Sequence, residues 1–324
     1  MNKVTFYFIL LITTVSLFSC SKEDAVTIPP PRDYAEQYKT DIADIEEYLK
    51  KNYITVVNHS GFVDDQNVTI TKIDAGQPSI YSYLNATTFP KLLSRNVSQN
   101  NITYTLYYLV LREGIGTSPC NVDGVLTSYK GDYLSRDATT KVLSATKFEE
   151  VIYPQSMLSL FSVITGWSET FPQFKTGTYT TNADGTGVHK DFGAGVIFIP
   201  SGLAYYNTGA GSIPSYSPLV FSFKLYGLER LDQDNDGILS YQEDLDGDKY
   251  VKTLATGVVN ADDTDKDGFP NFLDVDDDGD NYTTKLEIKN PATGLPYSFD
   301  LIPDCAGNVA NPTRIKKHLD KNCH

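Results

Sequence analysis

The sequence predicts an α+β fold: an antiparallel β-sheet wrapped around one short helix, with a helical region before it and a segment low in regular structure after it. Three observations support this prediction. Short β-branched and aromatic runs separated by Gly, Pro and Asn fill the middle of the chain, as is typical of antiparallel strands. Residues 156–167 carry apolar side chains at mixed spacing, which indicates a short helix ending in a loop that presents Trp167. An acidic block occupies residues 232–287.

The first 20 residues resemble a secretory signal, because one lysine precedes an apolar run that ends in Leu-Phe-Ser-Cys. This ending resembles the lipobox of bacterial lipoproteins, which implies lipidation of Cys20. The next residues, SKEDA, resemble the export signal of Bacteroidetes-type surface lipoproteins. We therefore expect a protein of the cell envelope, anchored to the outer membrane by its lipid and either periplasmic or surface-exposed. An uncleaved anchor helix is the alternative.

Residues 21–32 contain a run of prolines and predict a stiff tether. Residues 33–104 form a helical and irregular region in this prediction. Within it, Asp33 and Glu36 are placed as a capping box, and a helix is expected over residues 34–52. Its apolar side chains recur at helical spacing at Tyr38, Ile42, Ile45 and Leu49.

The clearest strand prediction is residues 219–225, where apolar and mixed residues alternate with the period of a half-buried strand. It closes a series of four sequence blocks: GVLTSYKGDYL, TKFEE, VITGWSETFPQFKTG and FIPSGLAYYNTGAGSIPSYSPLVFSFKL. These blocks follow one another as in the FKBP-type peptidyl-prolyl isomerases. The resemblance covers residues 105–228, and its second half is the more specific. A lone Trp beside Val and Ile is usually a core residue, but three further blocks in register favour a ligand cup.

The resemblance implies a hydrophobic cup that receives a proline ring. Trp167 would form its floor, while the Ile164 amide and the Tyr205 hydroxyl would hold carbonyls of the peptide. The implied site residues are Tyr129, Phe148, Glu149, Val163, Ile164, Trp167, Tyr205, Ile213 and Phe221. Proline-containing polypeptides are the expected partners.

Elementary chemistry agrees with such a cup. Amide resonance gives the peptide bond a rotation barrier of about 18–20 kcal/mol, and a dry apolar cup favours the twisted, less polar transition state over the planar ground state. A thousandfold acceleration needs only about 4 kcal/mol of this preference. No cofactor, nucleophile or general base is required, and the four histidines are scattered along the sequence.

Three departures from the family pattern leave the activity open. Glu149 stands where an aspartate is common, Tyr206 where a glycine is usual, and residues 180–195 lengthen one connection. Each could narrow or re-aim the cup. The alternatives to an isomerase are a non-catalytic proline-peptide-binding or chaperone module and a scaffold on a calcium-stiffened stalk.

The net charge of −14 is concentrated in one place: residues 232–287 hold 17 acidic and four basic side chains, a balance of −13. A concentrated acidic block calls for counter-cations, and nucleic acid is excluded as an expected partner. The segment DQDNDGILSYQE fits a calcium-loop template, and the pattern recurs from Asp263 and again from Asp274. Because Pro270 follows Phe269, we expect no regular exiting helix. The repeats resemble those of thrombospondin type 3.

The expected cofactor is structural Ca²⁺ bound in residues 231–288, and a solvated acidic linker is the alternative. The candidate ligands are Asp232, Asp234, Asp236, Ile238, Glu243, Asp244, Asp246, Asp248, Asp263, Asp265, Asp267, Phe269, Asp274, Asp276, Asp278 and Asp280. Residues 289–324 form a C-terminal tail in this prediction. Of the remaining cysteines, Cys305 and Cys323 are the nearer couple in sequence, with Cys120 free or the pairing different. The oligomeric state is left open.

Overall fold

A computed structural model of the chain describes residues 30–255 and 257–323. The predicted signal, Cys20 and most of the tether lie outside the described residues. Residues 33–324 form one compact unit. Among the described helices, none combines the length and apolar character needed to cross a bilayer.

The predicted N-terminal helix is confirmed as α2, Tyr34–Lys51. The Asp33 carboxylate caps it by accepting hydrogen bonds from the amides of Ala35 and Glu36 at 2.9 and 3.1 Å. Ile45 and Leu49 are completely buried. The apolar stripe of the sequence therefore faces the core, as its helical spacing indicates.

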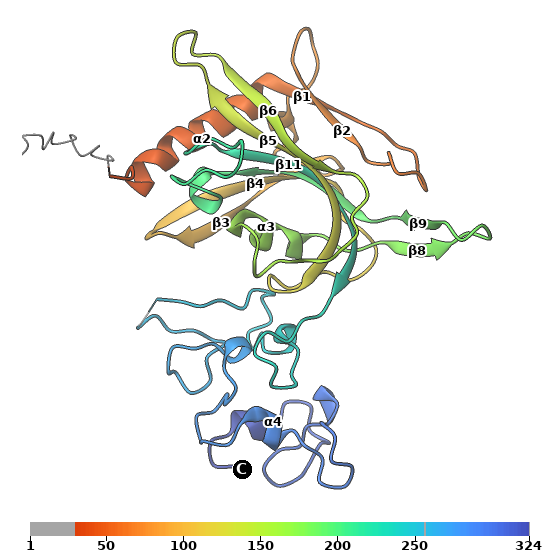
Figure 1. Ribbon diagram of the computed structural model, residues 1–324, viewed down its shortest axis with the longest axis vertical. Helices are drawn as coiled ribbons and strands as arrows, with labels where there is room; N and C mark the ends of the chain where they lie inside the picture. Colours follow the sequence, from red (N-terminus) through yellow and green to blue (C-terminus); the bar gives the residue numbers. More distant parts are fainter. Residues whose placement is uncertain (1–29, 256, 324) are drawn as a thin grey trace, which may run out of the picture. The chain divides into compact units, whose positions relative to one another are not determined.

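A seven-stranded antiparallel sheet forms the body of the fold. Its strand order is β3-β4-β10-β11-β5-β6, with β7 paired to β5. Figure 1 shows these strands curving around the short helix α3, so the predicted α+β class, an antiparallel sheet wrapped around a short helix, is confirmed. The strand bounds are β3 Lys91–Gln99, β4 Ile102–Arg112, β5 Gly124–Arg136, β6 Leu143–Val151, β7 Leu158–Ser159, β10 Gly193–Ile199 and β11 Leu219–Glu229.

Two hairpins stand beside this sheet. One is β1, Asn52–Val56, with β2, Val68–Lys72, and the other is β8, Thr178–Thr181, with β9, Gly187–Lys190. The second hairpin is the insertion that the sequence places at residues 180–195. The rest of the described chain holds α3, Thr165–Thr170, α4, Thr284–Glu287, and short 3₁₀ turns, of which four fall after residue 239. The C-terminal segment is thus low in regular structure, as predicted.

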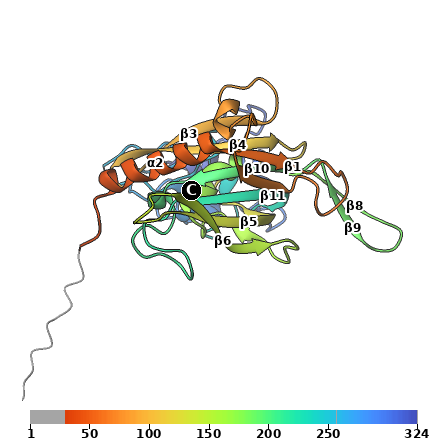
Figure 2. The same cartoon turned by 90° about the horizontal axis from the view of Figure 1, so that it is seen from above.

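The two faces of the sheet carry two separate cores. On the cup face, which bears Phe221 and Phe223, the strands pack on α3 and Trp167. On the outer face, which bears Val220, they pack on Ile45 and Leu49 of α2, and Figure 2 shows α2 running along the sheet. Strand β11 is consequently buried on both faces, whereas its sequence predicted a half-buried strand.

Two sequence-based boundaries differ from the structure. The boundary predicted between residues 104 and 105 falls inside β4, because β3 and β4 pair along their whole lengths within the same sheet. The short helix predicted before Trp167 starts later, at Thr165, and contains Trp167. Residues 156–164 instead form β7 and a turn, since the Leu158 backbone pairs with Val125.

Candidate proline-binding cup and cation sites

Trp167 lies at the centre of an aromatic cluster on the cup face. Its ring meets Tyr129 and Phe221 edge-on, with centroids 5.0 and 5.1 Å apart, and stacks on Phe171 at 5.1 Å. The side chain is 4% exposed, and its indole N–H has no hydrogen-bond partner among the described residues. A buried donor of this kind usually has a hydrogen-bond partner. The indole N–H at the floor of the cup is therefore available to an acceptor on a bound molecule.

The predicted walls surround this floor. Phe148 meets Phe221 edge-on at 5.5 Å, and Val163 and Ile164 are half-buried against the same core. Ile164 also begins α3, since its carbonyl accepts the Trp167 amide at 2.9 Å. Phe148 and Phe221 lie close together because their strands, β6 and β11, both pair with β5.

Two further predicted site residues, Ile213 and Tyr205, also lie next to the cup, and Tyr205 is at its rim. Ile213 is 7% exposed, packs in the same core and forms two backbone hydrogen bonds with Ala210, of 2.8 and 3.1 Å. Tyr205 is 37% exposed, so the cluster reaches solvent at this side. Burial raises the pKa of Tyr205, and the Glu149 charge adds to this shift. A protonated hydroxyl is therefore available there as a donor.

Glu149 lies beside Tyr129 at the rim. Burial and a hydrogen bond to the Glu149 carboxylate together raise the pKa of Tyr129 to about 12. The longer side chain thus reaches the tyrosine hydroxyl. Because of this departure from the family pattern, the Tyr129 side chain in the wall of the cup is hydrogen-bonded to Glu149.

The other two departures lie away from the cup. Tyr206 has a positive φ of 44°, which glycine adopts without strain, and its ring stacks on Tyr34 of α2 at 4.1 Å. The β8–β9 hairpin packs through His189 on Tyr226, with ring centroids 4.5 Å apart, and Tyr226 belongs to the outer-face core. Neither feature fills the space beside Trp167.

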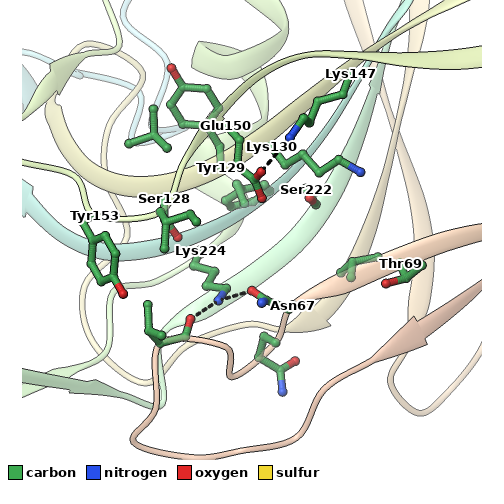
Figure 3. Close-up of a pocket in the computed structure, with 16 residues that line it drawn as sticks. Asn67, Thr69, Ser128, Tyr129, Lys130, Lys147, Glu150, Tyr153, Ser222 and Lys224 are labelled. Carbon is green, nitrogen blue, oxygen red and sulfur yellow. Dashed lines mark hydrogen bonds and ion pairs between the residues drawn. The ribbon is translucent and has the colours of Figure 1, made fainter.

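A separate cavity of about 700 Å³ lies on the outer face of β5 and β11. Figure 3 shows Lys224 at its base, hydrogen-bonded to Asn67. The Lys224 ammonium donates to the Val63 carbonyl and to Asn67 Oδ1, at 2.7 and 2.6 Å, and burial lowers its pKa to about 8. These bonds attach the loop between β1 and β2 to the sheet.

In the acidic segment, five groups of carboxylates converge within 4.8 Å. Four have the expected spacing, at Asp232–Asp236, Asp244–Asp248, Asp263–Asp267 and Asp276–Asp280. The fifth joins Asp236, Glu243 and Asp277, all of them almost completely buried. It brings together residues from two different repeats.

Among the described residues, no salt bridge joins a basic side chain to this buried group. Both carboxylate oxygens of Glu243 and of Asp277 are buried without a hydrogen-bond partner among the described residues. Burial, with repulsion from neighbouring carboxylates, raises the pKa of Glu243 to about 11 and that of Asp277 to about 9. Several carboxylates in one buried place are the donor set of a divalent cation such as Ca²⁺.

The four acidic loops share one hydrogen bond between a side chain and the backbone. In each, the first aspartate accepts the amide of the sixth residue, as Gly237 donates to Asp232 at 3.1 Å and Asn281 to Asp276 at 2.9 Å. The last loop therefore begins at Asp276, one step later than the predicted start at Asp274. Glu287 then takes the twelfth position, and its two carboxylate oxygens are buried without partners in the described chain.

The structure adds two candidate ligands to the predicted set, Asp277 and Glu287. Glu287 could be found from the sequence by counting from Asp276, but Asp277 could not, since it completes the loop of another repeat. The predicted carbonyl ligands differ in surroundings: the Ile238 side chain is buried beside Ile288 and Ile302, and Phe269 is 60% exposed. A 3₁₀ turn, Asn271–Leu273, follows Pro270, which confirms that no regular helix leaves this loop.

The three cysteines among the described residues carry free thiols. Cys323 is hydrogen-bonded to Cys305, and burial together with this contact raises the pKa of Cys323 to about 12. Cys120 is buried elsewhere, beside Val122 and Phe272. The couple that is nearer in sequence is thus also adjacent in space.

Comparisons with known proteins found one family model and one curated relative that match parts of the chain. Residues 233–312 match the family model described as "BamM C-terminal". The FKBP-type peptidyl-prolyl cis-trans isomerase FkpA of Aeromonas hydrophila is 30% identical over 147 residues, which cover 44% of this chain and 47% of FkpA. The chain therefore spans about half the length of this curated relative.

Two solved structures are also similar. A peptidyl-prolyl cis-trans isomerase from Pseudomonas syringae has 24% identity and a TM-score of 0.30, over 42% of this chain and 81% of that one. FkpA from Escherichia coli has 18% identity and a TM-score of 0.31, over 71% and 74%. The chain is thus similar to an FKBP-type peptidyl-prolyl cis-trans isomerase over somewhat less than half of its own length.

Proposed function

We propose that the chain is a peptidyl-prolyl cis-trans isomerase that acts on X-Pro bonds of envelope or secreted proteins. The observation that carries this proposal is the position of Trp167, which lies under a ring of aromatic walls with the partly exposed Tyr205 at the rim. X-Pro isomerisation otherwise takes tens to hundreds of seconds, so a catalyst is useful to any exported chain that contains proline.

The cup would act through its environment. A proline ring resting on Trp167 replaces water around the imide with apolar side chains, and this lowers the free energy of the twisted state relative to the planar one. The Tyr205 hydroxyl is a donor for a peptide carbonyl, and the Tyr129–Glu149 hydrogen bond keeps one wall in place. The chemistry needs no bond to the protein, since only rotation about C–N occurs.

The test is proline-peptide exchange measured by NMR on the full chain. Trp167→Leu is expected to remove most of the acceleration, because it removes the floor and leaves an apolar residue. Tyr179→Phe is the matched control, since Tyr179 is an exposed aromatic on β8. Peptide binding without acceleration by the wild type would favour the chaperone or binding module instead.

We further propose that residues 232–287 bind Ca²⁺ as a structural cofactor. The buried, unpartnered carboxylates of Glu243 and Asp277 support this role. Calcium is favoured over magnesium because flexible carboxylate and carbonyl ligands suit its six to eight oxygens. Calorimetric titration of Ca²⁺ into the chelator-treated chain tests it, with Mg²⁺ as competitor. Proteolysis that is equally fast with and without chelator would favour a solvated acidic linker.

We propose, finally, that a lipid on Cys20 anchors the protein to the outer membrane. The lipobox-like ending of the first 20 residues supports this proposal. Cys20→Ser is expected to move the protein from the membrane fraction to the soluble fraction. Protease treatment of intact cells then distinguishes a surface-exposed protein from a periplasmic one, and an unchanged membrane fraction for Cys20→Ser would argue for an uncleaved anchor.

A further inference from the structure

Tyr250, from the acidic C-terminal segment, contacts the short helix that carries Trp167. Its hydroxyl donates to the Glu169 carbonyl at 2.9 Å and accepts from Gln173 Nε2 at 2.8 Å. Glu169 is two residues beyond Trp167 on α3, and Gln173 is in the 3₁₀ turn that follows. Tyr250 is 4% exposed, so these hydrogen bonds are shielded from water.

Charged side chains reinforce the same contact. The buried Glu169 carboxylate pairs with Arg95 of β3 at 2.7 Å and with Lys252 of the C-terminal segment at 2.6 Å. The Arg95 guanidinium lies over the Tyr250 ring, 3.5 Å from its centroid. Loss of one partner from a buried pair is strongly destabilising, so α3 depends on this cluster for its position.

The segment around Tyr250 is also held by apolar packing. Val251 and Phe272 pack with Cys120 and Val122, and the Val251 carbonyl accepts a hydrogen bond from Asn121 at 2.8 Å. The Phe272 ring meets Phe161 edge-on at 5.8 Å. The isomerase-like sheet and the acidic segment therefore share one continuous interface in residues 33–324.

The buried carboxylate group of Asp236, Glu243 and Asp277 lies at the two ends of the stretch that contains Tyr250. Glu243 and Asp277 belong to the same group of converging carboxylates. A cation held there joins residue 243 to residue 277 and closes the stretch between them, which contains Tyr250 and Phe272. Closing a loop removes conformations in which these side chains leave the interface.

We propose that Tyr250 is a positioning residue for the cup: it fixes the turn of α3 beneath Trp167, and a cation bound by Asp236, Glu243 and Asp277 strengthens this hold. The effect on isomerisation rests on the proposed function, whereas the effect on Trp167 does not. With only six residues, α3 is too short to be stable without tertiary contacts. Trp167 therefore responds to whatever holds Glu169.

The chain provides its own reporter, because Trp167 is the only tryptophan. We would measure its emission and its quenching by acrylamide in the full chain, with Ca²⁺ and with chelator. Removal of Ca²⁺ from the wild type is expected to raise the quenching constant by about half or more. Tyr250→Phe, which keeps the ring under Arg95, should show the raised value even with Ca²⁺ and should no longer respond to chelator.

The isomerase assay supplies the second readout. Tyr250→Phe is expected to lower kcat/KM about 2- to 10-fold, the range of one lost hydrogen bond, while Tyr179→Phe leaves both readouts unchanged. Trp167 quenching that is the same in Tyr250→Phe and wild type, in Ca²⁺ and in chelator, would overturn the proposal. A wild type without isomerase activity would sink the proposed function alone, since the quenching comparison still decides the role of Tyr250. Chelation of the unmutated chain avoids any variant that fails to fold.

Discussion

The carboxylate of Glu149 holds the hydroxyl of Tyr129 at the rim of the cup. Both residues lie on neighbouring strands, with Glu149 of β6 opposite Gly131 of β5. Gly131 leaves the space that this arrangement needs, since a Cβ there would lie 2.4 Å from the Phe148 ring and 2.8 Å from Phe221. The wall of the cup is thus packed on one side and hydrogen-bonded on the other.

Glu149→Gln is the first prediction. The amide keeps the length of the side chain but removes the charge, so the hydrogen bond to Tyr129 weakens by about 1 kcal/mol. We expect kcat/KM for a proline peptide to fall about 2- to 5-fold and the free energy of unfolding to fall by no more than about 1 kcal/mol. Glu150→Gln, on the same strand, is the control. If the Glu149→Gln variant were as fast as the wild type, the hydrogen bond from Tyr129 to Glu149 would not be needed for the proposed activity.

Gly166→Ala tests the packing of α3. A Cβ at this position would lie 2.5 Å from Cγ2 of the fully buried Ile199, so the helix or the strand must shift. Overpacking of this kind costs about 1–3 kcal/mol, which urea unfolding measures. Gly227→Ala, with no neighbour closer than 3.6 Å, is expected to change stability much less. Equal effects of the two substitutions would contradict the predicted close contact.

Lys224 gives stability a pH dependence at alkaline pH. Burial lowers its pKa from 10.5 to about 8 in the folded chain, so between these values the unfolded chain binds more protons than the folded one. Stability from this group therefore rises as pH rises from about 8 towards 10.5, by about 1–3 kcal/mol. Urea unfolding of the wild type and Lys224→Met at pH 7.5 and 9.5 measures the difference. A parallel pH dependence in both proteins would show that Lys224 has no part in it.

Asp277→Asn tests the ligand that joins two repeats. Because Asp277 lies with Asp236 and Glu243, its loss is expected to weaken Ca²⁺ binding at this site by tenfold or more, measured by calorimetry. Asp184→Asn, an exposed aspartate of the β8–β9 hairpin, should bind Ca²⁺ as the wild type does. Wild-type affinity in Asp277→Asn would leave the first loop as a self-contained site.

The sequence predicted the parts of this structure that depend on local pattern. The α2 helix follows from Asp33 and the spacing of Ile45 and Leu49, and the cup residues follow from a family resemblance that places Trp167 beside Tyr129 and Phe221. The predicted roles of these residues in catalysis, and of the aspartates in calcium binding, remain predictions that the experiments above address.

What the sequence did not predict depends on contacts between distant segments. Asp277 joins Glu243, and Tyr250 reaches Glu169, across 34 and 81 residues of chain, and no local periodicity encodes such pairs. Lys224 reads as an outward side chain of a half-exposed strand, but the loop after β1 covers it. The start of α3 was placed too early because the backbone of β7 pairs with β5, a tertiary preference that overrides the apolar pattern.

Strand β3 has a practical consequence for any attempt to isolate the portion that carries the cup. A shortened chain starting at residue 105 would lack β3 and the first part of β4. It would also lack α2, which covers Leu109 and Phe198. An uncovered strand with apolar neighbours invites self-association. Residues 33–104, which precede the recognisable motifs, therefore belong to the same compact unit as the cup.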